Sequence, residues 1–202
     1  MEITVIGGGL AGCEAAWAIA QRGVAVRLYE MKPLRRTPAH SSDLLCELVC
    51  SNSLKAQRVD SAAGLLKEEM RRQDSVCLAA AAECAVPAGG ALAVDRERFA
   101  ALVTEKIRSH PLITVVSEEV TSLPEQGVTV VATGPLTAGP LAEDIARLCG
   151  GGLSFFDAAA PIVTAESVNM DSAFRASRYG REESGEGDYI NCPLNKEEYE
   201  AF

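Results

Sequence analysis

The sequence has few of the features that would place it in several common protein classes. Its 202 residues contain no uninterrupted apolar run of the roughly 18 residues that a membrane-spanning helix needs. The N-terminus carries no basic segment typical of an export signal, so we expect a protein that is neither exported nor anchored in a membrane. His40 and His110 are the only histidines, and neither a Ser-His-Asp arrangement nor a P-loop is visible. No motif of a serine hydrolase or a P-loop nucleotidase is therefore present.

The seven cysteines show no spacing typical of a metal site. They are Cys13, Cys46, Cys50, Cys77, Cys84, Cys149 and Cys192. An odd number without paired ligand spacing, in a chain that lacks an export signal, indicates free thiols in a reducing compartment. We therefore expect a cytoplasmic protein and no metal site.

Charge is distributed unevenly along the chain. The formal net charge is −9, which argues against a surface that binds nucleic acid throughout. Residues 22–72 nevertheless contain ten Lys and Arg against six Asp and Glu, a balance of +4. This basic segment includes Lys32, Arg35, Arg36, Lys55, Arg58, Arg71 and Arg72. It is compatible with an ordinary solvated surface or with a contact for an acidic partner.

A glycine-rich motif directly follows the first apolar segment. Residues 3–6 have the composition of a buried strand, residues 7–12 read Gly-Gly-Gly-Leu-Ala-Gly, and residues 13–22 predict a helix. In a dinucleotide-binding fold, Gly7 permits the tight turn, Gly9 allows close approach of a pyrophosphate, and Gly12 allows the helix to pack against the strand. The N-terminus of the helix would supply free N–H groups to the phosphates.

An acidic residue follows the second predicted strand, as this motif requires. Gly23 ends the helix, residues 24–29 read as a strand, and Glu30 comes next. A carboxylate at this place can accept hydrogen bonds from both ribose hydroxyls of an adenosine and disfavours a 2′-phosphate. The motif therefore predicts FAD or NAD rather than NADP; the alternative is a glycine turn of another α/β domain.

Strands and helices are predicted to alternate further along the chain. Helices are expected at residues 61–72, 95–109 and 141–149, and strands at residues 91–94, 113–117 and 128–132. Asp95 is a candidate N-cap. The pattern predicts an α/β protein with a Rossmann-like domain, a mostly parallel sheet at residues 1–152, and the beginning of a second domain at residues 153–202.

The segment around Cys50 has a composition unusual for a protein core. Cys50 is followed by Ser51, Asn52 and Ser53, whose polar groups would all need partners if they were buried. A thiol that faces a ligand fits this sequence, and a nearby Lys55 or helix N-terminus would lower its pKa. The alternative is that Cys50 is a small buried apolar residue, which we also expect for Cys13.

Six segments together carry a resemblance to one enzyme family. They are residues 7–16, 29–33, 47–54, 94–96, 132–137 and 191–193. In this order they resemble the TrmFO family of folate- and FAD-dependent tRNA (uracil-5-)-methyltransferases over the whole chain. Met-Lys-Pro and Val-Cys-Ser-Asn-Ser are the most specific segments. The sister family GidA or MnmG, which modifies the wobble uridine of tRNA, shares the glycine-rich opening but does not carry the Glu-Met-Lys-Pro and Leu-Val-Cys-Ser-Asn-Ser segments.

The resemblance implies a reaction and the residues that take part in it. Methylenetetrahydrofolate donates a one-carbon unit to C5 of the T-loop uridine in tRNA, reduced FAD supplies electrons, and NADH or NADPH reduces the flavin. Cys50 corresponds to the family's catalytic cysteine near the flavin, as general base, flavin partner or nucleophile. The implied cofactor-binding residues are Gly7, Gly8, Gly9, Leu10, Ala11, Gly12, Glu30, Asp95, Arg96, Thr133 and Gly134.

The resemblance also implies parts that this sequence lacks. Members of the family are about twice as long and carry a second catalytic cysteine in a Gly-Cys-Leu-Pro type segment, which Cys192 does not match. We therefore expect an N-terminal portion with most of the FAD-binding half. Two alternatives remain open: a wobble-uridine flavoprotein of the sister family, and a non-catalytic module that binds FAD or contacts tRNA. The basic segment is a candidate for tRNA docking.

Overall fold

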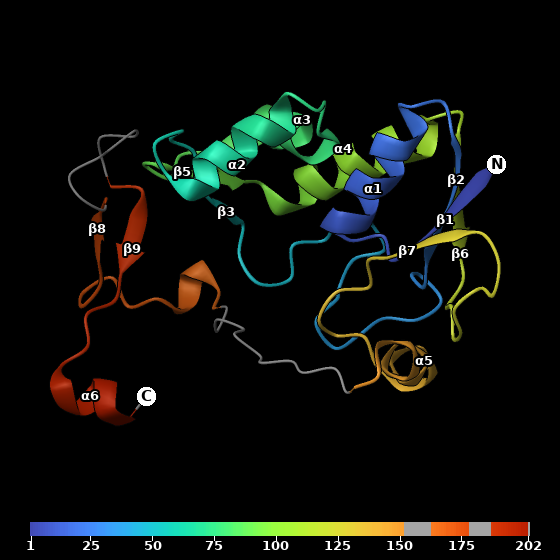
Figure 1. The fold of residues 1–202 in the computed structure, drawn as a ribbon. Helices are drawn as coiled ribbons and strands as arrows, with labels where there is room; N and C mark the ends of the chain where they lie inside the picture. Colours follow the sequence, from blue (N-terminus) through green and yellow to red (C-terminus); the bar gives the residue numbers. More distant parts are fainter. Residues whose placement is uncertain (152–162, 178–186, 202) are drawn as a thin grey trace.

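The computed structural model describes residues 1–151, 163–177 and 187–201. Its main element is a four-stranded sheet in the order β6-β2-β1-β7 (Figure 1). The strands are β1 (Glu2–Ile6), β2 (Ala25–Glu30), β6 (Ile113–Ser117) and β7 (Val128–Val131). All neighbouring strands are parallel, which confirms the predicted parallel α/β fold. The predicted domain boundary after residue 152 falls outside the described residues.

Two helices cover one face of this sheet. Helix α1 (Leu10–Ala20) packs against β1 and β2, and α4 (Arg96–Ser109) packs against β6. On α1, small residues face the sheet, including Cys13, Ala16 and Ala20, and all are buried. On α4, the apolar face includes the fully buried Phe99 and Val103. Small residues on α1 let its backbone approach the strands closely, while the larger side chains of α4 fill the core.

A second, smaller sheet lies beside the helices and differs from the prediction. It contains β3 (Ser53–Ala56), β5 (Ala91–Val94) and β4 (Ala85–Val86), which are antiparallel and ordered β3-β5-β4. The strand expected at residues 91–94 is present but belongs to this sheet, and β3 was not predicted. The β3–β5 pairing is irregular between Ser53 and Ala56, where Lys55 has φ of 69°. Such short, irregular strands leave little periodicity in the sequence.

Two helices connect β3 to β4. They are α2 (Ala62–Arg71) and α3 (Val76–Glu83). The hydroxyl of Ser61 accepts a hydrogen bond from the N–H of Gly64, and that of Ser75 accepts one from Leu78. Each serine thus satisfies one N–H that a helix leaves without an internal partner. The structure therefore confirms the helix predicted at residues 61–72.

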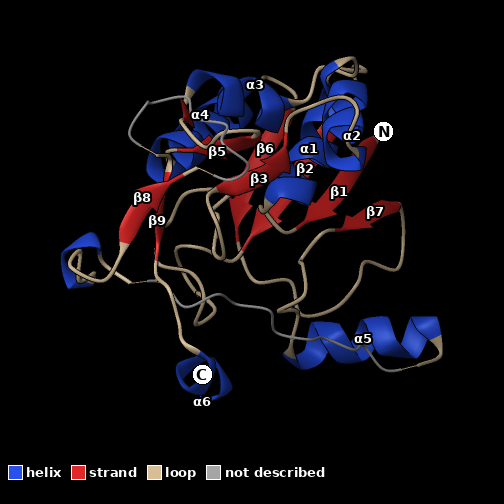
Figure 2. Ribbon diagram, turned by 90° about the vertical axis from the view of Figure 1, so that its left-hand side faces the viewer, coloured by secondary structure: helices blue, strands red, loops and turns tan. Residues whose placement is uncertain are grey.

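The elements after β7 contribute little to the main core. They are α5 (Gly139–Cys149), the 3₁₀ turn η1 (Ala165–Ser167), strands β8 (Phe174–Ala176) and β9 (Tyr189–Asn191), and α6 (Lys196–Ala201). Helix α5 lies apart from the layer formed by α1 to α4 in both ribbon views (Figures 1 and 2). The antiparallel β8–β9 hairpin is tied to the body by Tyr189, whose hydroxyl donates a 2.7 Å hydrogen bond to the carbonyl of Ala88.

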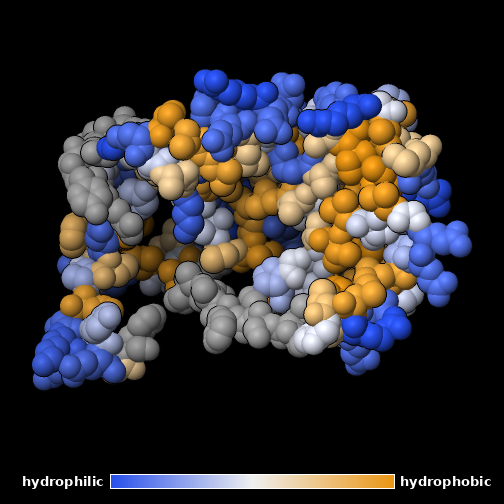
Figure 3. All heavy atoms as spheres, in the orientation of Figure 1, coloured by the Kyte–Doolittle hydropathy of each residue, from blue (hydrophilic) through white to orange (hydrophobic). Residues whose placement is uncertain are grey.

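The surface is apolar near the edge strand of the main sheet. Figure 3 shows apolar side chains gathered over the region of β1 and β7, whereas the surface over α2 and α3 is hydrophilic. Val128 and Val131 of β7 are 53% and 39% exposed. Among the described residues, no helix combines the length and apolar character needed to cross a membrane.

Candidate dinucleotide and thiol site

The segment of residues 7–12 between β1 and α1, here called the glycine turn, requires glycine at two positions for steric reasons. Gly7 has φ of +103°, and a Cβ there would lie 2.5 Å from the carbonyl oxygen of Ala132. A Cβ on Gly12 would lie 1.7 Å from the carbonyl oxygen of Gly7. Both contacts are with backbone atoms, which cannot move aside as a flexible side chain can. The turn and the close packing of α1 therefore both depend on glycine, as the motif predicts.

The position of Gly9 is open to a ligand. No atom would lie within 4 Å of a Cβ on Gly9, which is the N-cap residue of α1 and forms no side-chain cap. Leu10 and Ala11, the first residues of the helix, are exposed. The first N–H groups of a helix have no internal partner and carry its positive dipole end. This arrangement fits the pyrophosphate of a dinucleotide.

Glu30 lies beside the glycine turn at the end of β2. Its Oε2 accepts a 2.8 Å hydrogen bond from the N–H of Gly8, and its Oε1 accepts a 3.0 Å bond from the N–H of Lys32. Each carboxylate oxygen can accept more than one hydrogen bond, and Glu30 is only partly buried. The carboxylate is therefore held in a fixed orientation and can still accept bonds from ribose hydroxyls.

The loop after β7 lies against the glycine turn. A Cβ on Gly7 would be 2.9 Å from the Cα of Thr133, and Gly134 has φ of +73°. The hydroxyls of Thr133 and Thr137 lie 2.6 Å apart, and Thr137 also donates to the carbonyl of Gly134. In the sheet, β2 and β6 lie on one side of β1, and β7 lies on its other side. The strand order therefore reverses between β1 and β7. Ligands of open α/β sheets bind at such a point, beyond the carboxyl ends of the strands.

The segment of residues 31–52 between β2 and β3, here called the Cys50 loop, contains no helix or strand. Cys50 near its end is exposed. Its carbonyl accepts a 3.1 Å hydrogen bond from a guanidinium N–H of Arg96, at the start of α4. Asn52 pairs with Val94 through two bonds, since its side-chain amide donates to the carbonyl of Val94 and its carbonyl accepts from the N–H of Val94. The structure therefore brings the predicted residues Cys50 and Arg96 together.

Asp95 serves as the N-cap of α4, as the sequence predicts. Its carboxylate accepts a 3.0 Å hydrogen bond from the N–H of Arg98, and its own N–H donates to the carbonyl of Cys84. The contribution of Asp95 to cofactor binding stays a prediction.

Two groups of predicted site residues thus form, and the Cys50 loop joins them. The first group is the glycine turn with Glu30, Thr133 and Gly134; the second is Cys50 with Asp95 and Arg96. The N–H of Cys46 donates a 2.9 Å hydrogen bond to the carbonyl of Gly8, so the loop docks directly on the glycine turn. Cys46 adopts a left-handed conformation with φ of 54° to do so. Backbone strain of this kind is common at functional sites.

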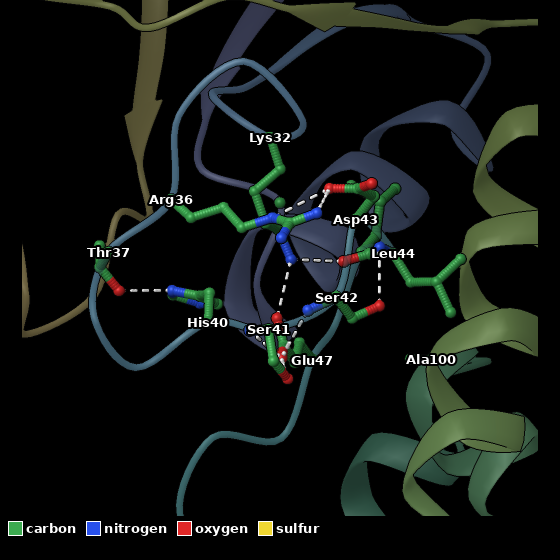
Figure 4. A network of polar contacts seen from close by, with 12 residues as sticks. Lys32, Arg36, Thr37, His40, Ser41, Ser42, Asp43, Leu44, Glu47 and Ala100 are labelled. Atoms are coloured by element: carbon green, nitrogen blue, oxygen red, sulfur yellow. Dashed lines mark hydrogen bonds and ion pairs between the residues drawn. The ribbon is translucent and has the colours of Figure 1, made fainter.

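A buried ion pair inside the Cys50 loop was missed by the sequence analysis. Lys32 is 4% exposed, and its ammonium donates to the carbonyl of Leu44 at 2.5 Å and to Oε2 of Glu47 at 3.3 Å (Figure 4). The other carboxylate oxygen of Glu47 accepts from the N–H and hydroxyl of Ser41 and the N–H of Ser42. Two opposite charges 15 positions apart within an irregular segment are the signal that could have indicated this pair.

The environment of Glu47 favours its charged form. Burial alone would raise the pKa of its carboxyl, but the hydrogen bonds from Ser41 and Ser42 and the charge of Lys32 outweigh this effect. The pKa of Glu47 therefore lies below its ordinary value.

Three buried cysteines lie behind the glycine turn. The Cys13 thiol donates to the carbonyl of Gly8 at 3.4 Å, and the sulfurs of Cys46 and Cys77 are 3.7 Å apart. Hydrogen bonds with the Cys13 and Cys77 thiols, together with burial, raise the pKa of Cys46 well above its ordinary value. A thiol held in its protonated form is a poor nucleophile. Cys13 is thus a buried apolar residue as predicted, whereas Cys50 is exposed and not one.

Most cations of the basic segment are buried or form ion pairs. Lys32 is buried, so its interpretation as one of the surface charges was wrong. The arginines form ion pairs: Arg35 with Glu119, Arg36 with Asp43, Arg58 with Asp60, and Arg71 and Arg72 with Glu68. Of these partners only Glu119 lies outside residues 22–72, whose balance of +4 already counts the others, so docking of tRNA on this segment stays a prediction.

The two histidines have local partners. Nδ1 of His110 accepts a hydrogen bond from the N–H of Leu112, and its ring packs edge-on against Trp17 with centroids 5.3 Å apart. Nδ1 of His40 lies 2.6 Å from the hydroxyl of Thr37. These contacts indicate a structural role for His110.

Comparisons with known proteins agree with this geometry. The protein is similar to methylenetetrahydrofolate–tRNA-(uracil-5-)-methyltransferase TrmFO of Citrifermentans bemidjiense, at 60% identity over 202 residues, which are 100% of this chain and 46% of the relative. TrmFO of Geobacter sulfurreducens is 60% identical over 201 residues, 99% of this chain and 46% of the relative. The chain thus spans about half the length of the curated relatives it matches.

A solved structure and a family-wide comparison complete the assignment. The crystal structure of Aquifex aeolicus GidA shares the fold with a TM-score of 0.51 at 18% identity, over 62% of this chain and 20% of GidA. The sequence model of the family described as glucose inhibited division protein A matches residues 2–202. The chain therefore belongs to the glucose inhibited division protein A (GIDA) family.

Proposed function

We propose that the protein methylates C5 of the T-loop uridine in tRNA, with methylenetetrahydrofolate as one-carbon donor, FAD as cofactor and NADH or NADPH as reductant. The observation that carries this proposal is the 60% identity, along the whole chain, to proteins named methylenetetrahydrofolate–tRNA-(uracil-5-)-methyltransferase. It is supported by an exposed thiol on a loop that docks on a dinucleotide-type turn.

The residues around the glycine turn fit FAD. The open space at Gly9 and the exposed start of α1 suit the pyrophosphate, and the carboxylate of Glu30 suits the ribose of the adenosine. Thr133 and Gly134 border the same turn. When bound, FAD supplies the electrons that convert a methylene group into a methyl group. The protein contributes the position of the cofactor and a thiol close to the site.

Cys50 is the residue we propose for the chemistry. C5 of uracil is a weak nucleophile until a thiolate adds to C6, so the reaction calls for a reactive cysteine. Cys50 is exposed, and its backbone is fixed by Arg96, whereas the thiols of Cys13 and Cys46 are buried. An exposed thiol at this place can act as nucleophile, general base or flavin partner. Trapping a covalent adduct between the protein and a tRNA that carries 5-fluorouridine would identify Cys50 as the nucleophile.

A labelled-donor assay tests the proposal. The protein expressed from its own gene should be yellow and, with NADH or NADPH, should transfer labelled carbon from methylenetetrahydrofolate to the T-loop uridine of unmodified tRNA. Cys50→Ala should abolish the transfer, because Cys50 is the thiol that we place next to the flavin. Cys149→Ser, which removes another exposed thiol, should leave it unchanged.

Three other results would overturn the proposal, each in favour of a different function. Transfer from S-adenosylmethionine would contradict the folate mechanism. Modification of the wobble uridine would assign the protein to the activity of the sister family, which the shared fold with Aquifex aeolicus GidA also allows. A protein that binds FAD stoichiometrically but modifies no tRNA would be a non-catalytic module.

A further inference from the structure

We infer that the buried Lys32–Glu47 ion pair is a positioning device for Cys50, acting through the Cys50 loop. The inference rests on the proposed function only where it concerns turnover. The placement of Cys50 can be measured without the reaction.

The Cys50 loop depends on side chains for its shape. Residues 31–52 contain no helix or strand, so no regular ladder of backbone hydrogen bonds fixes them. The ammonium of Lys32 instead reaches across the loop to the carbonyl of Leu44 and the carboxylate of Glu47. Glu47 then fixes Ser41 and Ser42 through three hydrogen bonds. One ion pair therefore organises the loop from residue 32 to residue 47 (Figure 4).

Cys50 lies between two anchors on this loop. Glu47 comes three residues before it, and Asn52, which pairs with Val94, comes two residues after it. The anchor at Asn52 is to the last residue of β5, the central strand of the second sheet, while the anchor at Glu47 consists of side-chain contacts. The segment before Cys50 therefore depends on the contacts of Lys32 and Glu47, while the carbonyl of Cys50 itself accepts from Arg96.

Burial makes this anchor rigid. The side chains of Lys32 and Glu47 are only 3% and 11% exposed. Without the ammonium, the carbonyl of Leu44 and one carboxylate oxygen would lose a donor in a place that water reaches poorly. The loop would then open to hydrate these groups, and Cys50 would move with it.

The same pair connects the thiol to the cofactor side of the site. The N–H of Lys32 donates to Glu30, and Glu30 also accepts from the N–H of Gly8. The contact with Glu30 uses the backbone of Lys32, and the contacts with Leu44 and Glu47 use its side chain. A substitution of the side chain should therefore disturb the thiol while the adenosine-binding carboxylate keeps its orientation.

The test is thiol alkylation of the FAD-bound protein, with each cysteine followed by peptide mass spectrometry. Lys32→Met should raise the iodoacetamide rate at Cys50 by about threefold or more, because the loop is released. Cys149 and Cys192, both exposed, should react at unchanged rates, and the buried Cys13, Cys46 and Cys77 should stay protected. Bound FAD should be unchanged. In the methylation assay, kcat should fall by about tenfold with little change in KM for the folate.

Lys106→Met is the matched control. It removes the same side chain from an exposed ion pair with Glu83 between α4 and α3. Alkylation of Cys50 should be unchanged in this variant, since an exposed pair of this kind contributes little. Glu47→Gln is the second variant and decides the matter if Lys32→Met does not fold, because it removes the charge of the pair and keeps the size of the side chain.

The outcomes separate this inference from the proposed function. Wild-type alkylation rates at Cys50 in folded Lys32→Met or Glu47→Gln would overturn it. An equal rise in the alkylation rates of the buried Cys13, Cys46 and Cys77 would also overturn it, since that result means general destabilisation of the fold. A selective change at Cys50 in a protein that methylates no tRNA would uphold the positioning and reject the proposed function.

Discussion

The glycine turn and the Cys50 loop are both irregular segments, but different groups hold them in place. In the glycine turn, the decisive contacts are between backbone atoms, such as the approach of Gly12 to the carbonyl of Gly7. In the Cys50 loop, side chains supply the contacts, either within the loop, as from Lys32 to Glu47, or from α4, as from Thr104 to Leu45. The first segment should tolerate no added atom at Gly7 or Gly12, and the second should respond to the loss of single polar groups.

The largest effect is expected from Gly12→Ala, which breaks the glycine turn. The new Cβ would lie 1.7 Å from the carbonyl oxygen of Gly7, so the start of α1 must shift away from β1. We expect a loss of about 3 kcal/mol or more in the free energy of unfolding, measured by urea denaturation.

Gly9→Ala is the matched control in the same turn. No atom lies within 4 Å of the new Cβ, and Gly9 has an ordinary φ of −76°. Stability should therefore change by less than about 1 kcal/mol, while FAD affinity falls because the methyl group occupies the space assigned to the pyrophosphate. A Gly12→Ala variant as stable as Gly9→Ala would contradict the view that backbone contacts fix this turn.

The same difference explains how much the sequence could predict. The glycine turn is visible in the sequence because its steric requirements fall on residues only a few positions apart, between a strand and a helix. The antiparallel pairing of Ser53 with Ala93 joins residues 40 positions apart through strands too short to show a period.

Burial of charge was equally hidden from the sequence. Lys32 was assigned to a basic surface because its burial depends on Glu47 and Leu44, which the fold brings to it. Asp95, by contrast, was identified as an N-cap from the local pattern alone. A local pattern was therefore enough to predict a helix cap, whereas the burial of a charge depends on partners that only the fold brings together.

An intermediate effect is expected from Thr104→Val, which weakens the Cys50 loop. The hydroxyl of Thr104 accepts a buried 2.9 Å hydrogen bond from the N–H of Leu45 and donates to the carbonyl of Ala100. Valine has the same shape but leaves the N–H of Leu45 without this partner. We expect a loss of about 2 kcal/mol in the free energy of unfolding and faster hydrogen exchange at Leu45.

Thr114→Val provides the comparison for Thr104→Val. Thr114 is exposed on β6, so the same change should alter stability by less than about 0.5 kcal/mol. Equal stability of the two variants would show that the buried bond from α4 does not hold the loop.

The smallest effect concerns the pH dependence of the Cys50 loop. The pKa of Glu47 lies below its ordinary value, because the bonds from Ser41 and Ser42 and the charge of Lys32 outweigh the effect of burial. A carboxyl whose pKa is lower in the folded than in the unfolded state stabilises the fold above its unfolded pKa, near 4. This contribution is lost as the pH falls through the folded pKa.

Unfolding curves of the wild type and Glu47→Gln between pH 3 and 7 would measure this contribution. The stability difference between them should be constant from about pH 5 to pH 7 and should shrink below about pH 4, because protonation removes the same charge that the substitution removes. The alkylation rate of Cys50 in the wild type should rise toward that of Glu47→Gln over the same acidic range, once corrected for the lower fraction of thiolate. A difference independent of pH would mean that the hydrogen bonds of Glu47 matter and its charge does not. At the glycine turn, the amides of Gly7 and Cys13, which donate to the backbone carbonyls of Tyr29 and Gly9, should keep their hydrogen-exchange protection throughout this range.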